Sequence, residues 1–204
     1  MRNYLTEAIG TFFLVLAVCF TGNPLAIGLM LAVMVYIGGH ISGGHYNPAV
    51  SLAVFFRKGL SSQSLVGYWA SQIIGAFLAA MVFYIISHKT FVPMPGVGYS
   101  FQSALILELL CTFELALVVL TVATASKLKG NYVYGFAIGL TVTSAAFIAG
   151  PISGGAFNPA VALGPIILDA MLGGSGLANL LLYILGPLAG GALAAFVFGY
   201  INNE

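Results

Sequence analysis

The chain contains the stretch ISGGHYNPAV at residues 41–50 and repeats it as ISGGAFNPAV at residues 152–161, with eight of ten positions identical. Both copies are polar and rich in glycine, yet each lies between strongly apolar stretches. Irregular backbone is tolerated at membrane depth only where it lines a cavity or is buried in protein. The repeat therefore predicts a membrane protein that folds two non-helical segments into its interior.

The composition also indicates an integral membrane protein. Of the 204 residues, 60% are hydrophobic and only 5% are charged, against about 25% charged residues in a soluble domain. A helix needs about 20 residues to cross the hydrocarbon core of a bilayer. The candidate spans are approximately Tyr4–Thr21, Leu25–Gly38, Leu65–Ser87, Phe101–Ala125, Tyr132–Ala149 and Leu177–Ile201. We therefore expect an all-α fold in which residues 1–204 form a single transmembrane domain.

The rest of the composition excludes several classes of function. The net charge of +1 gives no indication of a nucleic-acid partner. Six spans leave very little chain for anything else, and no segment resembles a soluble enzymatic domain. We expect no enzyme activity, catalytic residue, cofactor or metal site.

The repetition includes the apolar segments. Glu7 and Glu108 open the same Glu-x3-Thr-Phe pattern, and residues 27–29 match residues 138–140. Each half, approximately 1–98 and 99–204, holds three spans, and an odd number means that the second half enters the membrane from the opposite side. The chain is therefore predicted to consist of inverted repeats.

The basic residues predict the orientation. Cytoplasmic connections of membrane proteins carry an excess of Lys and Arg. With the N-terminus inside, only Lys89 falls outside, and the residues on the cytoplasmic face are Arg2, Arg57, Lys58, Lys127 and Lys129. We expect both termini in the cytoplasm.

A short apolar run follows each Asn-Pro-Ala motif. These runs, Asn47–Phe56 and Asn158–Leu168, would reach about 15 Å as helices, which is half the thickness of the hydrocarbon core. The first must return to the cytoplasmic side and the second to the outside. We expect two re-entrant half-helices whose N-termini meet at the midplane.

The chemistry of the motif suggests what this meeting point does. Asn caps a helix with its side-chain oxygen and keeps its NH₂ donors for other partners, and Pro suits the first helical position. Each N-terminus also carries about half a positive charge, so cations should be repelled. A central water would turn its oxygen towards both asparagines, which breaks a chain of proton-relaying waters. The predicted pore centre comprises Asn47, Pro48, Ala49, Asn158, Pro159 and Ala160; a single motif could instead be a capped buried helix.

The glycine pairs ahead of the motifs let the chain run extended with its carbonyls exposed. We expect these carbonyls to form a ladder of acceptors. The predicted pore-lining carbonyls belong to Gly43, Gly44, His45, Gly154 and Ala156.

Over essentially its whole length the chain resembles the major intrinsic proteins, that is, aquaporins and aquaglyceroporins. The resemblance rests on both Asn-Pro-Ala motifs, the sequence SGGHYNPAV at residues 42–50 and the paired Glu7 and Glu108. It implies a right-handed bundle of six helices with two re-entrant half-helices, one pore per subunit and a homotetramer. It further implies that Glu7 and Glu108 accept hydrogen bonds from the re-entrant loops and that His45 lines the inner mouth. The alternatives are carboxylates that snorkel to water and a plain loop histidine.

One position departs from the family pattern. Most members follow the second Asn-Pro-Ala with an arginine of the selectivity filter, and here the residue is Val161. The other three filter positions fall at Ile27, Ala146 and Gly155, so the filter should be wide and mostly apolar. Some bacterial members associated with uncharged metalloid acids also lack the arginine. We therefore expect a bacterial or archaeal plasma membrane protein.

The favoured function is a passive channel for water and small uncharged solutes, such as glycerol, urea or uncharged metalloid acids. A strict water channel is one alternative. A secondary transporter is another, because inverted repeats with broken helices also build transporters; its candidate protonatable groups are Glu7, Glu108 and Glu114. A membrane scaffold with an occluded pore is a third.

Overall fold

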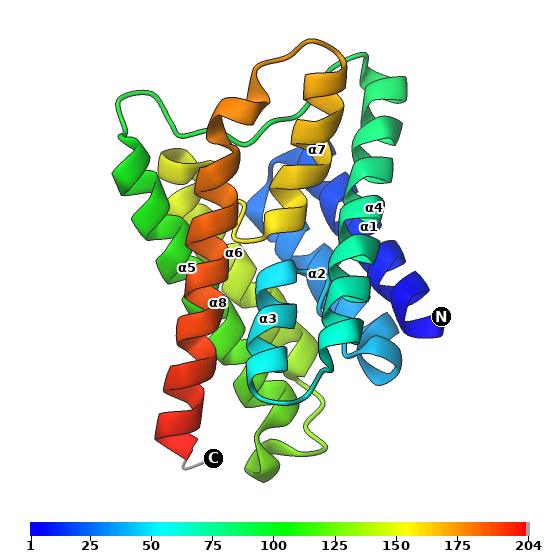
Figure 1. The fold of residues 1–204 in the computed structure, drawn as a ribbon, viewed down its shortest axis with the longest axis vertical. Helices are drawn as coiled ribbons and strands as arrows, with labels where there is room; N and C mark the ends of the chain where they lie inside the picture. The colour runs from blue at the N-terminus through cyan, green and yellow to red at the C-terminus, as the bar shows by residue number, and fades with distance from the viewer. Residues whose placement is uncertain (203–204) are drawn as a thin grey trace.

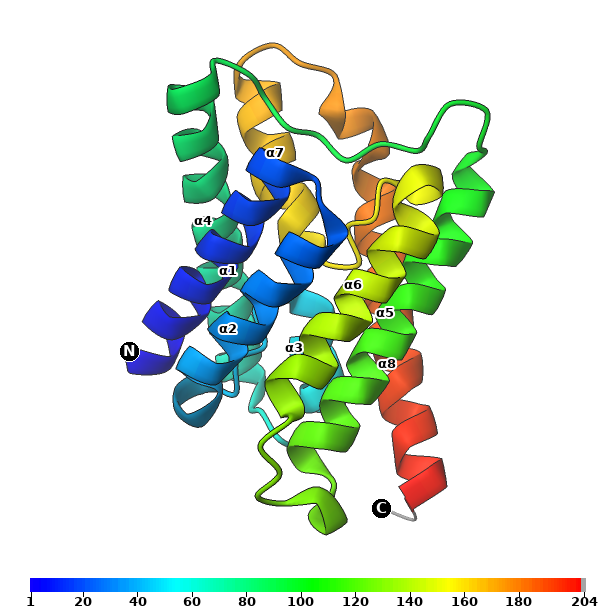
Figure 2. The same cartoon turned by 180° about the vertical axis from the view of Figure 1, so that it is seen from behind.

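The computed structural model describes residues 1–202, and these form a bundle of long helices with two shorter helices on the side that faces the viewer in Figure 1 and lies behind the bundle in Figure 2. The long helices are α1 (Arg2–Thr21), α2 (Pro24–Ser42), α4 (Ser62–Ser87), α5 (Phe101–Thr124), α6 (Tyr134–Ser153) and α8 (Leu180–Asn202). The shorter ones are α3 (Pro48–Phe56) and α7 (Pro159–Met171), with 3-10 turns at η1 (Ser126–Leu128) and η2 (Gly176–Asn179). Within the described residues, six helical spans are long and apolar enough to cross a membrane. The predicted all-α fold with six spans and two half-helices is confirmed.

Several helices run further than the sequence predicted. α2 ends at Ser42 rather than Gly38, and α6 ends at Ser153 rather than Ala149. Gly38 lies inside α2 and leaves room for packing, because a Cβ there would lie 1.9 Å from the hydroxyl oxygen of Tyr46. The first two residues of each repeated stretch therefore belong to the preceding helix.

The two halves of the chain interlock. Within each half, the first helix packs against its two neighbours, α1 against α2 and α4, and α5 against α6 and α8. Each half-helix also packs against a helix of the other half, α3 against α8 and α7 against α4. Small residues allow the close approach: a Cβ at Gly75 would lie 2.2 Å from the carbonyl oxygen of Ala8, and one at Gly191 2.4 Å from that of Ala49.

The two ends of the bundle differ in their basic residues. Both described chain ends lie in the lower half of Figure 1, where the α3–α4 and α5–α6 connections also lie. Arg57, Lys58, Lys127 and Lys129 belong to these connections, whereas Lys89 belongs to the α4–α5 connection at the upper end. These connections place more basic residues at the lower end of the bundle than at the upper end.

Candidate functional site

The two half-helices begin at asparagines in the centre of the molecule. The Oδ1 atom of Asn47 accepts from the backbone N–H of Ala49 at 2.8 Å, and that of Asn158 accepts from Ala160 at 2.9 Å. Both side chains are buried. The asparagines thus cap α3 and α7 with their oxygens and keep their N–H donors free of their own helices.

Each asparagine also binds the other half of the chain. Nδ2 of Asn47 donates to the carbonyl oxygen of Phe157 at 2.9 Å, and Nδ2 of Asn158 donates to that of Tyr46 at 2.8 Å. An amide carries two N–H bonds, so each asparagine has one donor left rather than two. The paired bonds hold the two helix N-termini against each other.

Glu7 and Glu108 are fully buried and bind the backbone just before each motif. Glu7 accepts from the N–H of His45 at 3.0 Å and of Tyr46 at 2.7 Å. Glu108 accepts from the equivalent N–H groups of Ala156 at 3.0 Å and Phe157 at 2.7 Å. The carboxylates therefore draw these N–H groups to one side of each loop.

Hydroxyl groups of the preceding helices complete the two sets of bonds. Ser42 donates its hydroxyl to Glu7 at 2.6 Å, and Ser153 donates to Glu108 at 2.8 Å. Gln72 adds a fourth donor to Glu7 through Nε2 at 2.8 Å. Glu7 thus accepts four hydrogen bonds and Glu108 accepts three.

The sequence suggested that the glycine pairs run extended, and this prediction is wrong. Gly43 and Gly44 have φ values of 92° and 62°, and Gly154 and Gly155 have 90° and 65°. These values lie in the left-handed region, which glycine adopts at no steric cost. They end α2 and α6 sharply, so that the chain can turn back towards the centre.

Some of the carbonyls ahead of the motifs accept no hydrogen bond from the described residues, although those of Tyr46 and Phe157 accept from the two asparagines. None of the hydrogen bonds within residues 1–202 ends on the carbonyl oxygens of the five predicted residues, Gly43, Gly44, His45, Gly154 and Ala156. Buried carbonyls normally have a partner. These oxygens are therefore available to a molecule that passes beside them.

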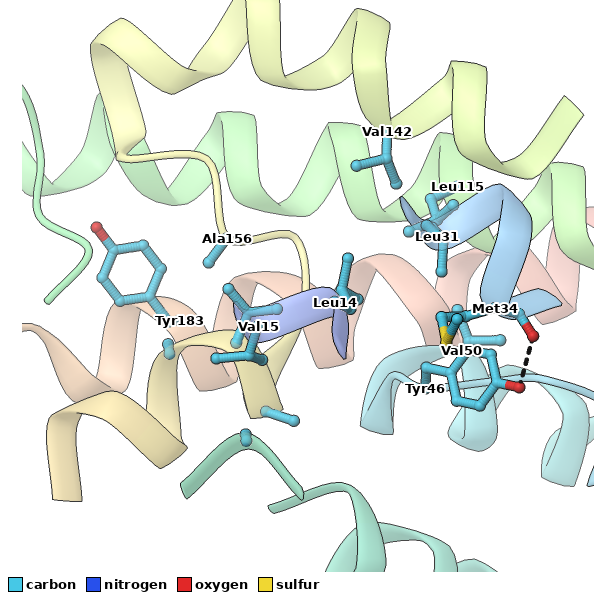
Figure 3. Close-up of a cluster of buried hydrophobic side chains, with 14 of the residues drawn as sticks. Leu14, Val15, Leu31, Met34, Tyr46, Val50, Leu115, Val142, Ala156 and Tyr183 are labelled. Atoms are coloured by element: carbon cyan, nitrogen blue, oxygen red, sulfur yellow. Dashed lines mark hydrogen bonds between the residues drawn. The ribbon is translucent and has the colours of Figure 1, made fainter. Parts of the chain in front are cut away.

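A narrow cavity of about 40 Å³ lies beside the paired asparagines, and both side chains contribute to its wall. One water needs roughly 10–15 Å³, so about three waters fit. The four predicted filter residues, Ile27, Ala146, Gly155 and Val161, all line this cavity. Much of the remaining wall is aliphatic and comes from several helices; Figure 3 shows Leu14, Leu31, Val50, Leu115 and Val142.

Wider hollows adjoin the narrow cavity at both ends. A hollow of about 600 Å³ at the lower end shares His45 and Ile138 with it. A hollow of about 360 Å³ at the upper end shares Ile27, Ala146 and Gly155. The three spaces therefore adjoin, with the smallest volume in the middle, and three of the predicted filter residues lie where the middle and upper spaces meet.

The chain matches the family model described as "Major intrinsic protein" over residues 1–198. It belongs to this family. It is 37% identical to "Aquaporin NIP1-1" of Oryza sativa subsp. japonica over 219 residues, covering 99% of this chain and 75% of that protein. It is 36% identical to "Glycerol uptake facilitator protein-like 6" of Lactiplantibacillus plantarum, with both chains covered completely.

A solved structure agrees with the fold. The chain aligns to the aquaglyceroporin from Plasmodium falciparum with a TM-score of 0.82, covering 100% of this chain and 95% of that one at 23% sequence identity. As a member of the major intrinsic protein family, the chain is an integral membrane channel for water and small solutes and not an enzyme.

Not every residue of the family motif reaches the cavity. Pro48, Ala49, Pro159 and Ala160 form the first turns of α3 and α7, are buried, and do not line it. These four residues instead form the first positions of the two half-helices. Of the six residues predicted for the pore centre, Asn47 and Asn158 are the two that line this cavity.

His45 lies where the narrow cavity meets the lower hollow and lines both. Its Nδ1 atom is 3.1 Å from the hydroxyl of Ser51, which in turn accepts from Nε2 of Gln72 at 2.9 Å. Neither Ser51 nor Gln72 was predicted. In the second half, Ala156 and Ala162 take the places of His45 and Ser51, so this polar cluster belongs to one end of the passage only.

Two tyrosines that the repeat did not reveal also hold the loops. The hydroxyl of Tyr68 donates to the carbonyl of Ser42 at 2.7 Å, and that of Tyr183 donates to Ser153 at 2.5 Å. Tyr183 lies 115 residues after Tyr68 (183 − 68), whereas the serines lie 111 apart (153 − 42). The two bonds are equivalent, but the residues come from different turns of α4 and α8, and comparison of the repeats therefore missed them.

Proposed function

We propose that the chain is a passive channel for water and small uncharged solutes, such as glycerol, urea or an uncharged metalloid acid, and that it excludes ions and protons at Asn47 and Asn158. The observation that carries the proposal is the pair of bonds between each asparagine and the opposite loop, at 2.9 and 2.8 Å. They fix two helix N-termini beside one narrow cavity. Each terminus contributes about half a positive charge.

The proposed exclusion of cations rests on the sign of the charges that line the narrow cavity. The carboxylates of Glu7 and Glu108 would attract a cation, but their oxygens accept four and three hydrogen bonds from the protein. The cavity wall instead presents N–H donors of the two asparagines and the positive ends of the half-helices. A central water therefore turns its oxygen to Asn47 and Asn158 and cannot pass a proton onward.

Selection among neutral solutes is assigned to Ile27, Ala146, Gly155 and Val161, which line the narrow cavity without a charge or a ring. Such side chains offer a polar solute no hydrogen bonds to replace those that it loses when it leaves water. The carbonyls of Gly43, Gly44, His45, Gly154 and Ala156 supply acceptors in its place, and Glu7 and Glu108 hold the loops that carry them. This combination favours small neutral hydrogen-bonding solutes over a strict selection for water.

We further assign both termini to the cytoplasm, the protein to a bacterial or archaeal plasma membrane, and the active form to a homotetramer with one pore per subunit. The single domain spans residues 1–204 as inverted repeats of about 1–98 and 99–204. The basic lower end supports this orientation.

Stopped-flow light scattering on proteoliposomes tests the proposed function, with water, glycerol, urea and an uncharged metalloid acid compared. Flux should rise linearly with solute concentration and ignore ion gradients. Saturation or coupling to an ion gradient would indicate a transporter, and flux equal to that of empty liposomes would indicate an occluded scaffold.

A matched pair of variants on α6 serves as control. Ala146→Trp places an indole in the narrow cavity, whereas Ile148→Trp places one on the exposed face of the same helix. Flux should fall to the level of empty liposomes only in the first variant. Equal flux in both would show that the solutes do not use this passage.

A further inference from the structure

The lower ends of α3 and α8 lie side by side (Figure 1) and border an open groove of about 680 Å³ on the outside of the bundle. Its wall includes Ala192, Ala195 and Gly199, which recur on one face of α8 at helical spacing. Because these side chains are small, they leave a trough beside the end of α3. Among the described residues, this α3–α8 groove shares no lining residue with the three spaces of the passage.

Three aromatic side chains border the α3–α8 groove. Phe56 beside it on α3 is 52% exposed, and Phe196 and Tyr200 on α8 are 74% and 81% exposed. Rings on the outside of a membrane-spanning helix face apolar surroundings, and tyrosine favours the level of the lipid headgroups. The trough and its rim therefore suit an acyl chain.

A guanidinium stands at the lower end of the groove. Arg57 directly follows the last residue of α3 and lines the groove, and its Cζ atom lies 5.4 Å from the centre of the Phe198 ring on α8. This contact draws the positive charge towards α8. A guanidinium has five N–H donors, can bind more than one group at a time and matches the geometry of phosphate oxygens. Lys58 is exposed next to it and adds a second positive charge.

We infer that the α3–α8 groove binds an anionic phospholipid, with the lipid phosphate at Arg57 and one acyl chain along Ala192 and Ala195. The order of the chemistry along the groove carries the inference, because the wall is apolar along the helices and basic where they end. Basic residues near the membrane surface attract lipids with a net negative charge. The inference concerns the outer surface of the bundle and does not depend on which solute passes through it.

The first test is native mass spectrometry of the full chain in detergent, with phosphatidylglycerol and phosphatidylcholine of the same acyl chains as probes. Both lipids carry a phosphate diester, and they differ in net charge. Wild type should bind phosphatidylglycerol more tightly, and Arg57→Gln should lower the ratio of the two binding constants about fivefold, the size of the attraction between one basic side chain and an anionic surface. Arg57→Lys should keep most of this ratio, because it keeps the charge. Lys127→Gln is the control, since it removes an exposed charge from the other connection at the same end and should leave the ratio unchanged.

The second test fills the trough. Ala192→Phe places a ring inside the α3–α8 groove, whereas Leu185→Phe places one on an exposed face of the same helix. Ala192→Phe should weaken the binding of phosphatidylglycerol, because the acyl chain loses its place, and Leu185→Phe should not. Added inorganic phosphate should leave the bound lipid in place.

Each contrary result rejects a named part of the inference. An unchanged ratio in Arg57→Gln would reject the headgroup site, and equal lipid binding in Ala192→Phe and Leu185→Phe would reject the trough. Displacement of the lipid by inorganic phosphate would mean that the site takes a free anion. A shift from oligomers to monomers in Ala192→Phe would mean that a second copy of the chain covers the groove. None of these readouts uses flux, so failure of this inference and failure of the proposed function are distinguishable.

Discussion

Single residues decide how many donors and acceptors meet inside this bundle. Glu108 accepts from one hydroxyl and two backbone N–H groups and is fully buried. Glu108→Ala would leave these donors without an acceptor, at a cost of about 1–3 kcal/mol for each unsatisfied group. We expect a lower melting temperature and lower flux together, measured by thermal unfolding in detergent and by stopped flow.

Glu7→Ala is the matched comparison, since Glu7 accepts four hydrogen bonds rather than three. Its loss of stability should be the larger of the two. Wild-type melting and flux in Glu108→Ala would show that the carboxylate does not support the loop.

Val161 permits a second prediction at this scale. Val161→Arg would place a guanidinium with five donors beside the other residues of the narrow cavity. The larger side chain should reduce glycerol and urea permeability much more than water permeability, because water passes a narrower and more polar ring. An equal fractional loss of glycerol and water permeability would show that Val161 does not line the selective constriction.

At the scale of helices, the two half-helices should act through their N-terminal charge. Asn158→Asp keeps an oxygen for the cap on Ala160 but loses the donor to Tyr46. The added carboxylate offsets the positive ends of α3 and α7, so proton leak should rise. A pH-sensitive dye inside the liposomes measures it.

The control for this change is Gln63→Glu, at the exposed start of α4. It adds the same charge away from the narrow cavity and should leave the proton leak unchanged. A leak in Asn158→Asp no greater than in this control would mean that the helix ends are not the proton barrier.

The helices are also where sequence reasoning succeeded and failed most clearly. Apolar length and the Asn-Pro start are local signals, and they located six spans and both half-helices. The predicted ends of α2 and α6 were wrong because both helices continue to the serine of the repeated stretch, and α6 runs through Pro151. The course of residues 88–100 could not be predicted, because they have no periodic pattern and tertiary bonds to Asp169 and Ile152 place them.

At the scale of the whole molecule, Glu114 is the charge that the single subunit leaves unexplained. It lies near the middle of α5 and is exposed on the outside of the bundle. Ile106 and Leu110 precede it on the same face and are 57% and 50% exposed. A carboxylate facing lipid at mid-depth is costly, by roughly 2.5–3.5 kcal/mol on insertion scales. The proposed homotetramer would remove this cost if a neighbouring subunit covers that face.

Glu114→Leu should therefore weaken assembly, because it relieves the isolated subunit of the cost and removes an acceptor from the contact. Native mass spectrometry in detergent would report fewer tetramers and more monomers than in wild type at equal concentration. Ile106→Leu, an apolar exchange on the same face, should leave the distribution unchanged. If Glu114→Leu instead kept the wild-type distribution and raised the melting temperature, the carboxylate would face lipid, and the contact between subunits would have to lie on another face of the bundle.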